Sequence, residues 1–226
     1  MPAAPRGKRA QKYLEERQHI QNLYEDVSFD QDLYHLIVQK GVGTLLLGIL
    51  LVLIYLITAW QSGDLLVTSD EVLEQWGQQN QKVLTGEIWR LFSSILIHAD
   101  LPHLLSNVFF LLAFGWKMEE LRGRFHLIAI FFLTALGGNL LTLSLEIFGT
   151  LEIVSVGASG GVQGVFAAVA TILYYDSREK GSIFFNFLVF MILFTVGPKV
   201  NIFAHFGGMV AGLIIESIVM RLRIRS

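Results

Sequence analysis

The stretch GVGTLLLGILLVLIYLITAWQSG, residues 41–63, contains no charged side chain. A helix needs about 20 apolar residues to cross the hydrocarbon core of a bilayer, and this run is long enough. The whole chain is 53% hydrophobic and 16% charged, with a mean hydropathy of +0.55, which is too apolar for a soluble domain of 226 residues. The sequence therefore predicts an all-α integral membrane protein.

Five further uncharged runs follow the first, at residues 101–116, 125–145, 153–175, 181–198 and 200–215. Together they predict a bundle of six transmembrane helices that forms a core over residues 41–220. The connection 61–100 is the longest one and contains tryptophans, so we expect it to have its own structure near the headgroups. Residues 1–40 are a polar arm in which short amphipathic helices are expected, and residues 221–226 form a basic tail.

The positive charges predict the orientation in the membrane. With six spans, all but three of the 17 Lys and Arg residues fall on the side of the two termini, the exceptions being Lys82, Arg90 and Lys199. The positive-inside rule then places both termini in the cytoplasm and the 61–100 loop outside. The long polar arm that precedes the first span, with its glutamates, does not suit a signal or transit peptide, so a plasma (inner) membrane, bacterial by default, is predicted.

Four polar side chains within the predicted spans point to a site. Ser159, His205 and His103 each lie roughly 24 to 26 Å above the cytoplasmic end of their own helix, and therefore at one depth. Asn107 follows His103 by four residues and shares its helix face. Because polar groups in hydrocarbon need a partner or a purpose, these residues are the candidates for function.

A serine, two histidines and an asparagine are the groups that acyl transfer uses. The hydroxyl is the nucleophile, an imidazole accepts its proton, and side-chain donors stabilise the oxyanion. No acidic residue is expected at this depth, because Glu146 and Glu216 are at the ends of predicted spans and Glu152 is in a loop. A catalytic site here is therefore predicted to be a Ser-His dyad. The absence of cysteine excludes disulfides, thiol nucleophiles and thiolate metal sites.

Small residues surround two of these candidates. The stretch SVGASGGVQG, residues 155–164, gives the fourth span a small-residue strip that includes Gly157 and Gly160, and Gly208 belongs to a similar strip on the sixth. Such strips let membrane helices approach closely, which would bring the hydroxyl of Ser159 near the imidazole of His205. Taken singly, each feature also has a plain reading: glycines that only pack, and polar residues that only join helices.

The motifs taken together resemble the rhomboid family of intramembrane serine proteases, over residues 89–212. The resemblance is carried by motifs in the family's order and spacing: WR at Trp89–Arg90, HADLPHLLSN with His98, His103 and Asn107, the Glu119 to Gly123 turn, GASG around Ser159, and AHFGG with His205.

The resemblance implies a role for each residue. Ser159 is the implied nucleophile and His205 the general base, while His103, Asn107 and the backbone N–H of Ser159 form the oxyanion hole. Arg90 is expected to brace the outer loop, and His98 to lie near the watery mouth of the site. The implied partners are transmembrane protein substrates and the lipid bilayer. Neither a cofactor nor a metal nor nucleic acid is implied, and the oligomeric state is not predicted.

Two other classes of function remain open at this level. A rhomboid-like pseudoprotease would bind membrane proteins as a chaperone or adaptor, although the chain retains both Ser159 and His205. A small-solute transporter would need polar groups from one membrane face to the other, whereas the lower halves of these spans are apolar.

Overall fold

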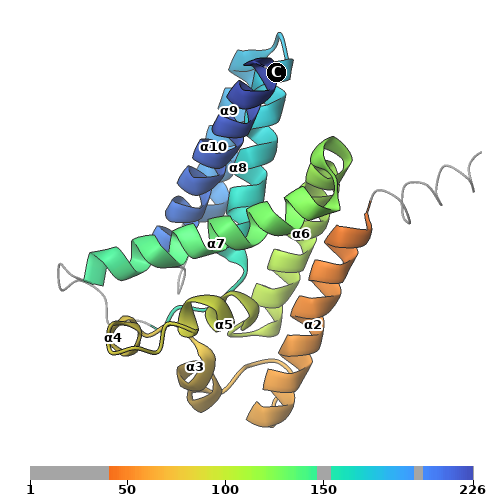
Figure 1. The fold of residues 1–226 in the computed structure, drawn as a ribbon. Helices are drawn as coiled ribbons and strands as arrows, with labels where there is room; N and C mark the ends of the chain where they lie inside the picture. The colour runs from red at the N-terminus through yellow and green to blue at the C-terminus, as the bar shows by residue number, and fades with distance from the viewer. Residues whose placement is uncertain (1–40, 147–153, 196–200, 226) are drawn as a thin grey trace, which may run out of the picture. The chain divides into compact units, whose positions relative to one another are not determined.

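The described part of the chain is predominantly helical. The computed structural model describes residues 41–146, 154–195 and 201–225, which belong to one compact unit, Gly41–Ser226 (Figure 1). The helices are α2 (Val42–Ser62), α3 (Asp70–Trp76), α4 (Asn80–Leu84), α5 (Arg90–Leu96), α6 (Leu101–Arg122), α7 (Arg124–Glu146), α8 (Ser159–Asp176), α9 (Lys180–Thr195) and α10 (Ile202–Arg225). The predicted amphipathic arm, Glu152 and Lys199 lie outside the described residues.

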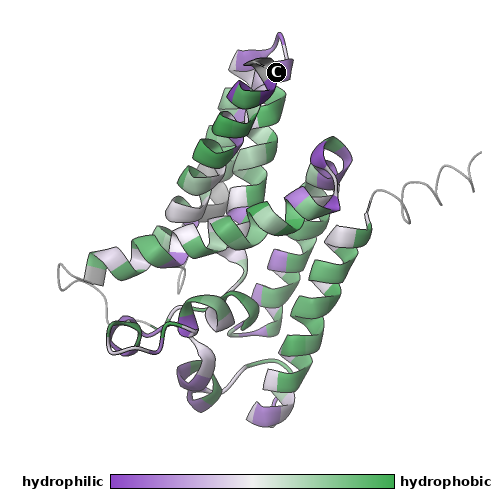
Figure 2. Ribbon diagram, viewed as in Figure 1, coloured by the Kyte–Doolittle hydropathy of each residue, from purple (hydrophilic) through white to green (hydrophobic). Residues whose placement is uncertain are grey.

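Each of the six predicted runs overlaps with one long helix: α2, α6, α7, α8, α9 or α10. Within the described residues, three helices are long and apolar enough to cross a membrane: Val42–Ser62, Arg124–Leu145 and Ile202–Arg223. Figure 2 shows how continuous the hydrophobic colour is along α2. The chain is thus a helical membrane protein, and the count of six spans stays a prediction.

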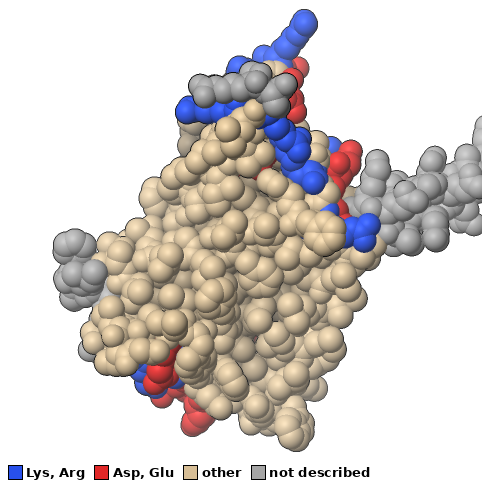
Figure 3. Space-filling model, viewed as in Figure 1, with Lys and Arg blue, Asp and Glu red and all other residues tan. Residues whose placement is uncertain are grey.

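Charged side chains gather at two ends of the face drawn in Figure 3. One group, mostly Lys and Arg atoms with some acidic ones, lies over the ends of α6, α8 and α10. A second group, with both acidic and basic atoms, lies around α3 and α4, and a broad uncharged band separates the two groups. This is the distribution expected of a protein that sits in a bilayer.

The loop between α2 and α6, residues 63–100, carries three short helices, as expected of a connection with its own structure. Ser69 caps α3 by accepting the N–H of Val72, and the loop closes on itself where the N–H of Thr68 donates to the carbonyl of Ala99 at 2.9 Å. An isolated antiparallel bridge between Gln78 and Ser155 attaches the same loop to the segment before α8.

Helix α8 begins later than the predicted run, at Ser159 instead of residue 153. The segment before it is held in extended and turn conformations, because Ser155 exchanges two 2.9 Å backbone hydrogen bonds with Gln78 and Gly157 has a φ of 123°. A positive φ of this kind does not continue into a helix and favours glycine. Ser159 therefore occupies the first turn of α8, not a position inside it.

Helix α10 packs most extensively on α8 and α7. Glycines make this contact, since a Cβ added to Gly208 would overlap the carbonyl oxygen of Gly160, and one added to Gly212 would overlap that of Gly164. The small-residue strips predicted from the sequence therefore do face each other. In lipid, where little hydrophobic force joins helices, such close van der Waals contact is a main source of association.

Two buried carboxylates join other helices. Glu119 on α6 accepts hydrogen bonds of 2.9 Å from the backbone N–H groups of Gly43 and Thr44 and from the Thr44 hydroxyl, at the beginning of α2. Glu216 on α10 is fully buried and pairs with Arg122 at 3.0 Å and with His126 at 2.8 Å. Both arrangements satisfy a charge that would otherwise be costly to bury.

Candidate active site

A cavity of about 330 Å³ contains the residues that the sequence singled out. Its lining includes Ser159 from α8, His205 from α10, and His103 and Asn107 from α6, together with Gly157. The structure thus brings together, at one cavity, the hydroxyl, the imidazoles and the amide that had been predicted only from a shared depth.

The conformation of Gly157 brings the α8 serine close to His103. The backbone N–H of Gly157 donates to the carbonyl of Ser94 at 2.8 Å, and its φ of 123° turns the chain into α8. A Cβ at residue 157 would lie 2.8 Å from His103 Nε2 and 3.6 Å from Ser159 Oγ. The side-chain atoms of Ser159 and His103 are therefore neighbours across this glycine, and any other residue would push into the histidine ring.

His205 occupies the first turn of α10, on the side where that helix touches α8. It is 7% exposed and lines the cavity. The carbonyl of the preceding residue, Ala204, would lie 3.1 Å from a Cβ added to Gly160. The first turns of α8 and α10, which carry Ser159 and His205, are therefore in direct backbone contact.

His103 and Asn107 lie on successive turns of α6. Asp100 caps this helix, its Oδ1 accepting the N–H of His103 at 2.7 Å. The amide of Asn107 is 5% exposed and donates one N–H to the His103 carbonyl at 2.9 Å. An asparagine amide has two N–H groups, so the second is the one that an acceptor in the cavity would use.

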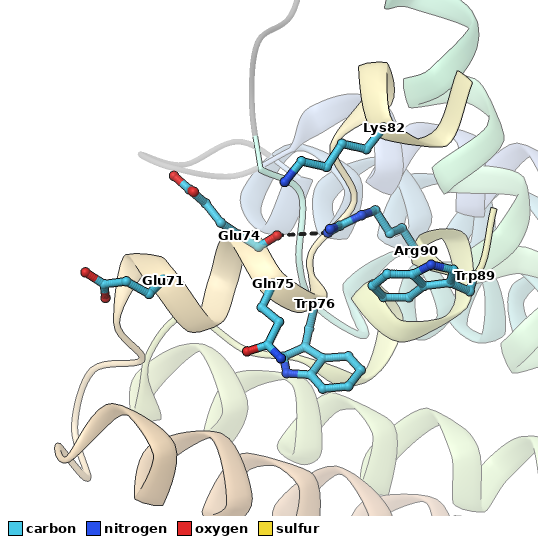
Figure 4. A pocket seen from close by; sticks show the side chains of 7 residues that line it. All are labelled: Glu71, Glu74, Gln75, Trp76, Lys82, Trp89 and Arg90. Atoms are coloured by element: carbon cyan, nitrogen blue, oxygen red, sulfur yellow. Dashed lines mark hydrogen bonds between the residues drawn. The ribbon is translucent and has the colours of Figure 1, made fainter. Parts of the chain in front are cut away.

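Arg90 and Trp89 belong to the 63–100 loop and not to the cavity. Arg90 is 4% exposed; its Nη1 donates to the carbonyls of Glu74 and Gly77 at 2.9 and 2.7 Å, and its Nε pairs with Glu87 at 2.6 Å. Its guanidinium also lies 4.6 Å from the centre of the Trp89 ring. Figure 4 shows Arg90 reaching the backbone of Glu74, and these contacts brace the loop as expected of this residue.

His98 is in the protein interior and not at a watery mouth, so that expectation is wrong. Its side chain is fully buried, with its ring 5.1 Å from that of His103, and its carbonyl accepts the Thr68 hydroxyl at 2.7 Å. Burial, followed by the neighbouring His103, lowers the pKa of His98 from 6.5 to about 3. His98 is therefore a neutral, buried ring that packs edge to face against the ring of His103.

Sequence reasoning missed several polar residues of the cavity. Asp100 lines it, although no acidic residue was expected at this level, because its position before the α6 run had placed it in the loop. Asn201, Ser155 and Asn139 line it as well. An asparagine or aspartate directly before an apolar helix is a capping signal, and this signal identifies both Asp100 and Asn201.

The arrangement has the groups that acyl transfer requires. The Ser159 hydroxyl is at the start of α8 and lines the same cavity as the imidazoles of His103 and His205. The first N–H groups of a helix have no partner inside the helix and can donate to an oxyanion. Among the described residues, no three His, Asp or Glu side chains are grouped as a metal site would need.

Comparisons with known proteins show which family the chain belongs to. The family model of the rhomboid domain matches residues 85–222. The chain is 30% identical over 148 residues to RHOMBOID-like protein 5 of Arabidopsis thaliana. This match covers 63% of the present chain and 47% of that protein. The chain is 25% identical over 166 residues to Rhomboid-like protease 1 of Toxoplasma gondii, covering 70% of this chain and 57% of the relative. A Bacillus subtilis relative is 28% identical over 142 residues.

The match to RHOMBOID-like protein 6, mitochondrial, of Arabidopsis thaliana is 32% identical over 162 residues, 67% of this chain and 51% of the relative. The matched region thus spans about half the length of several of these relatives. The family model covers more than half of the present chain and includes every residue of the cavity named above. The chain belongs to the rhomboid family.

Proposed function

We propose that this protein is an intramembrane serine endopeptidase that cleaves transmembrane protein substrates with a dyad of Ser159 and His205. The observation that carries the proposal is the common cavity that these two residues line with His103 and Asn107. Membership of a family with relatives named as proteases supports a hydrolase.

The mechanism follows from the positions of the four groups. The imidazole of His205 accepts the proton of the Ser159 hydroxyl as Oγ bonds to a substrate carbonyl carbon. The resulting oxyanion accepts hydrogen bonds from His103, from the second amide N–H of Asn107 and from the backbone N–H of Ser159. The C–N bond then breaks, and the leaving amine takes the proton from His205.

Deacylation uses water in the same way. His205 accepts a proton from a water molecule that attacks the acyl carbon, and the Ser159 oxygen leaves with that proton as the acid product forms. Asp100 lines the cavity, but its Oδ1 is bonded to the backbone of His103. We therefore keep the dyad, which without a carboxylate partner is expected to turn over more slowly than a triad enzyme.

We place the protein in a plasma membrane, bacterial by default, with six spans and with both termini in the cytoplasm. The 63–100 loop is then outside, and the cavity opens to the outer face, which supplies its water. The two separated groups of charge on the face in Figure 3 support this orientation. The arm 1–40 and the tail 221–226 are then cytoplasmic.

The test uses the purified protein of residues 1–226 in detergent and in vesicles, with a set of single-span test substrates. Wild type is expected to cleave at least one of them and to react with a fluorophosphonate probe, whereas Ser159→Ala and His205→Ala do neither. Ser144→Ala, which changes an exposed serine on α7 whose hydroxyl donates to the carbonyl of Leu141 in the same helix, is the control and should behave as wild type. Cleavage that persists in both dyad variants would rule out the mechanism. Substrate binding without any probe reaction would instead favour the pseudoprotease alternative.

A further inference from the structure

One asparagine side chain connects the elements that carry the two dyad residues. The amide of Asn201, the residue before α10, donates to the Ser155 hydroxyl at 2.8 Å and to the Thr142 hydroxyl at 3.1 Å. Its Oδ1 accepts the backbone N–H groups of Phe203 and Ala204, each at 3.1 Å. The Asn201 amide therefore makes four hydrogen bonds, which reach three segments: the first turn of α10, the chain before α8, and α7.

These contacts are next to the proposed catalytic groups on both sides. Asn201 precedes His205 by four residues, and its carbonyl accepts the His205 N–H at 3.2 Å, so the two share one face of the first turn. Ser155 precedes Ser159 by four residues and is fixed by its two backbone bonds to Gln78. The Asn201 amide therefore links the turn that carries His205 to the segment that leads into Ser159.

The arrangement goes beyond ordinary helix capping. A cap needs only an oxygen that accepts the free N–H groups of the first turn, and aspartate supplies this as well as asparagine. The two donated bonds add nothing to the cap, but they join α10 to Ser155 and Thr142, whose side chains are 6% and 1% exposed. Buried hydrogen bonds of this kind set a fixed separation.

We propose that Asn201 is a positioning residue that sets the distance between His205 and Ser159 through its two donated hydrogen bonds. The inference rests on the proposed protease function. The Oδ1 atom of Asn201, which caps α10, contributes to stability, and its Nδ2 group, which donates two hydrogen bonds, contributes to catalytic geometry. Substitution can separate these two contributions.

The decisive variant is Asn201→Asp, which keeps the capping oxygen and removes both donors. We expect kcat, and the rate of fluorophosphonate labelling, to fall by between about 10-fold and 100-fold, because small misplacements of reacting groups cost this much. KM is expected to change by less than about 2-fold, since both lost hydrogen bonds join protein groups to each other, and the unfolding midpoint should stay near that of wild type. Ser155→Ala should behave likewise, and the double variant should be no worse than either single one.

Asn80→Asp is the matched control. Asn80 is also a buried asparagine that donates to residue 142, in this case to its carbonyl at 3.3 Å, but it holds the 63–100 loop and does not line the cavity. The same loss of a donor and gain of a charge there should leave kcat within about 2-fold of wild type. If Asn80→Asp and Asn201→Asp lose activity equally, or in proportion to a loss of stability, the positioning role is wrong.

A second readout does not depend on activity. The ring signals of His205 in histidine-labelled protein, assigned by their loss in His205→Gln, should shift in Asn201→Asp and not in Asn80→Asp. Unchanged ring signals would overturn the inference even if the protein proves to be a protease. Shifted signals in a protein whose Ser159→Ala variant still cleaves would instead refute the proposed function and leave the structural link intact.

Discussion

Adding one methyl group at Gly208 should separate the two helices of the proposed dyad. A Cβ at this position would overlap the carbonyl oxygen of Gly160 and lie 2.8 Å from the carbonyl carbon of the same residue. The optimal separation of two non-bonded carbon atoms is roughly 3.5 to 4.0 Å, so α8 and α10 would have to move apart by about 1 Å. The obstruction is backbone, which cannot rotate away as a side chain would.

The expected magnitude follows from this displacement. Overpacking of a tight contact costs about 1 to 3 kcal/mol of stability. The same displacement of about 1 Å would separate the first turns that carry Ser159 and His205. A misplacement of this size lowers turnover by about 100-fold. Gly208→Ala is thus expected to lose far more activity than its modest loss of stability would explain.

Gly48→Ala is the control for this prediction. Gly48 is a buried helix glycine on α2, and a Cβ added there meets no atom within 4 Å. Its replacement should leave labelling unchanged and stabilise the helix by about 0.5 to 1 kcal/mol. Unfolding midpoints in detergent and second-order rates of fluorophosphonate labelling measure both effects. Labelling of Gly208→Ala at the wild-type rate would show that the separation of α8 and α10 does not set the dyad geometry.

Three further predictions concern the surrounding structure. The buried His98 has a pKa of about 3 in the folded state against 6.5 in the unfolded state. Its contribution to stability is therefore complete above pH 6.5 and is lost as the pH falls toward 3, by about 1.4 kcal/mol per pH unit. Between pH 7.5 and pH 5 the free energy of unfolding should fall more steeply in wild type than in His98→Gln, and equal slopes would contradict this. Glu119→Gln removes the charged acceptor of three hydrogen bonds and should cost about 2 to 3 kcal/mol, with faster hydrogen exchange at the start of α2, whereas the exposed Glu120→Gln should change stability by less than about 0.5 kcal/mol. Arg90 uses Nη1 for two carbonyls and Nε for Glu87. Lysine has one nitrogen and no planar guanidinium, so in Arg90→Lys limited proteolysis should cut the 63–100 loop faster than in Lys82→Gln, and equal cutting would refute the bracing role.

The helical runs could be predicted because the signal for a membrane helix is local. An uncharged stretch such as residues 41–63 has to form its own backbone hydrogen bonds in lipid, so composition and length alone specify a helix there. The beginning of α8 could not be predicted in this way. It depends on the bonds of Ser155 to Gln78, a residue far away in the sequence, and on the positive φ of Gly157.

The sequence predicted that Ser159 and His205 belong to one site, but it did not predict the residues that pack around them. Equal depth pointed to Ser159 and His205 because depth depends only on counting residues along helices. The position of His98 depends instead on how the 63–100 loop packs on α2, α7 and α8, which no local pattern specifies. The network of Asn201 was missed for the same reason, although its place before an apolar run marks it as a cap.

The position of His205 is determined by backbone contacts on two sides of α10. On one side, Gly160 and Gly208 bring α10 onto α8; on the other, a Cβ on Gly138 of α7 would overlap the carbonyl of Ala204, and one on Gly207 would lie 2.9 Å from the Gly138 Cα. Because each contact involves main-chain atoms, rotamer changes cannot loosen it, and in lipid such contact is itself what holds the helices together. The glycines, poor helix formers in water, are therefore required here, since they let α7 and α8 both pack closely on the turn that carries His205, the proposed base.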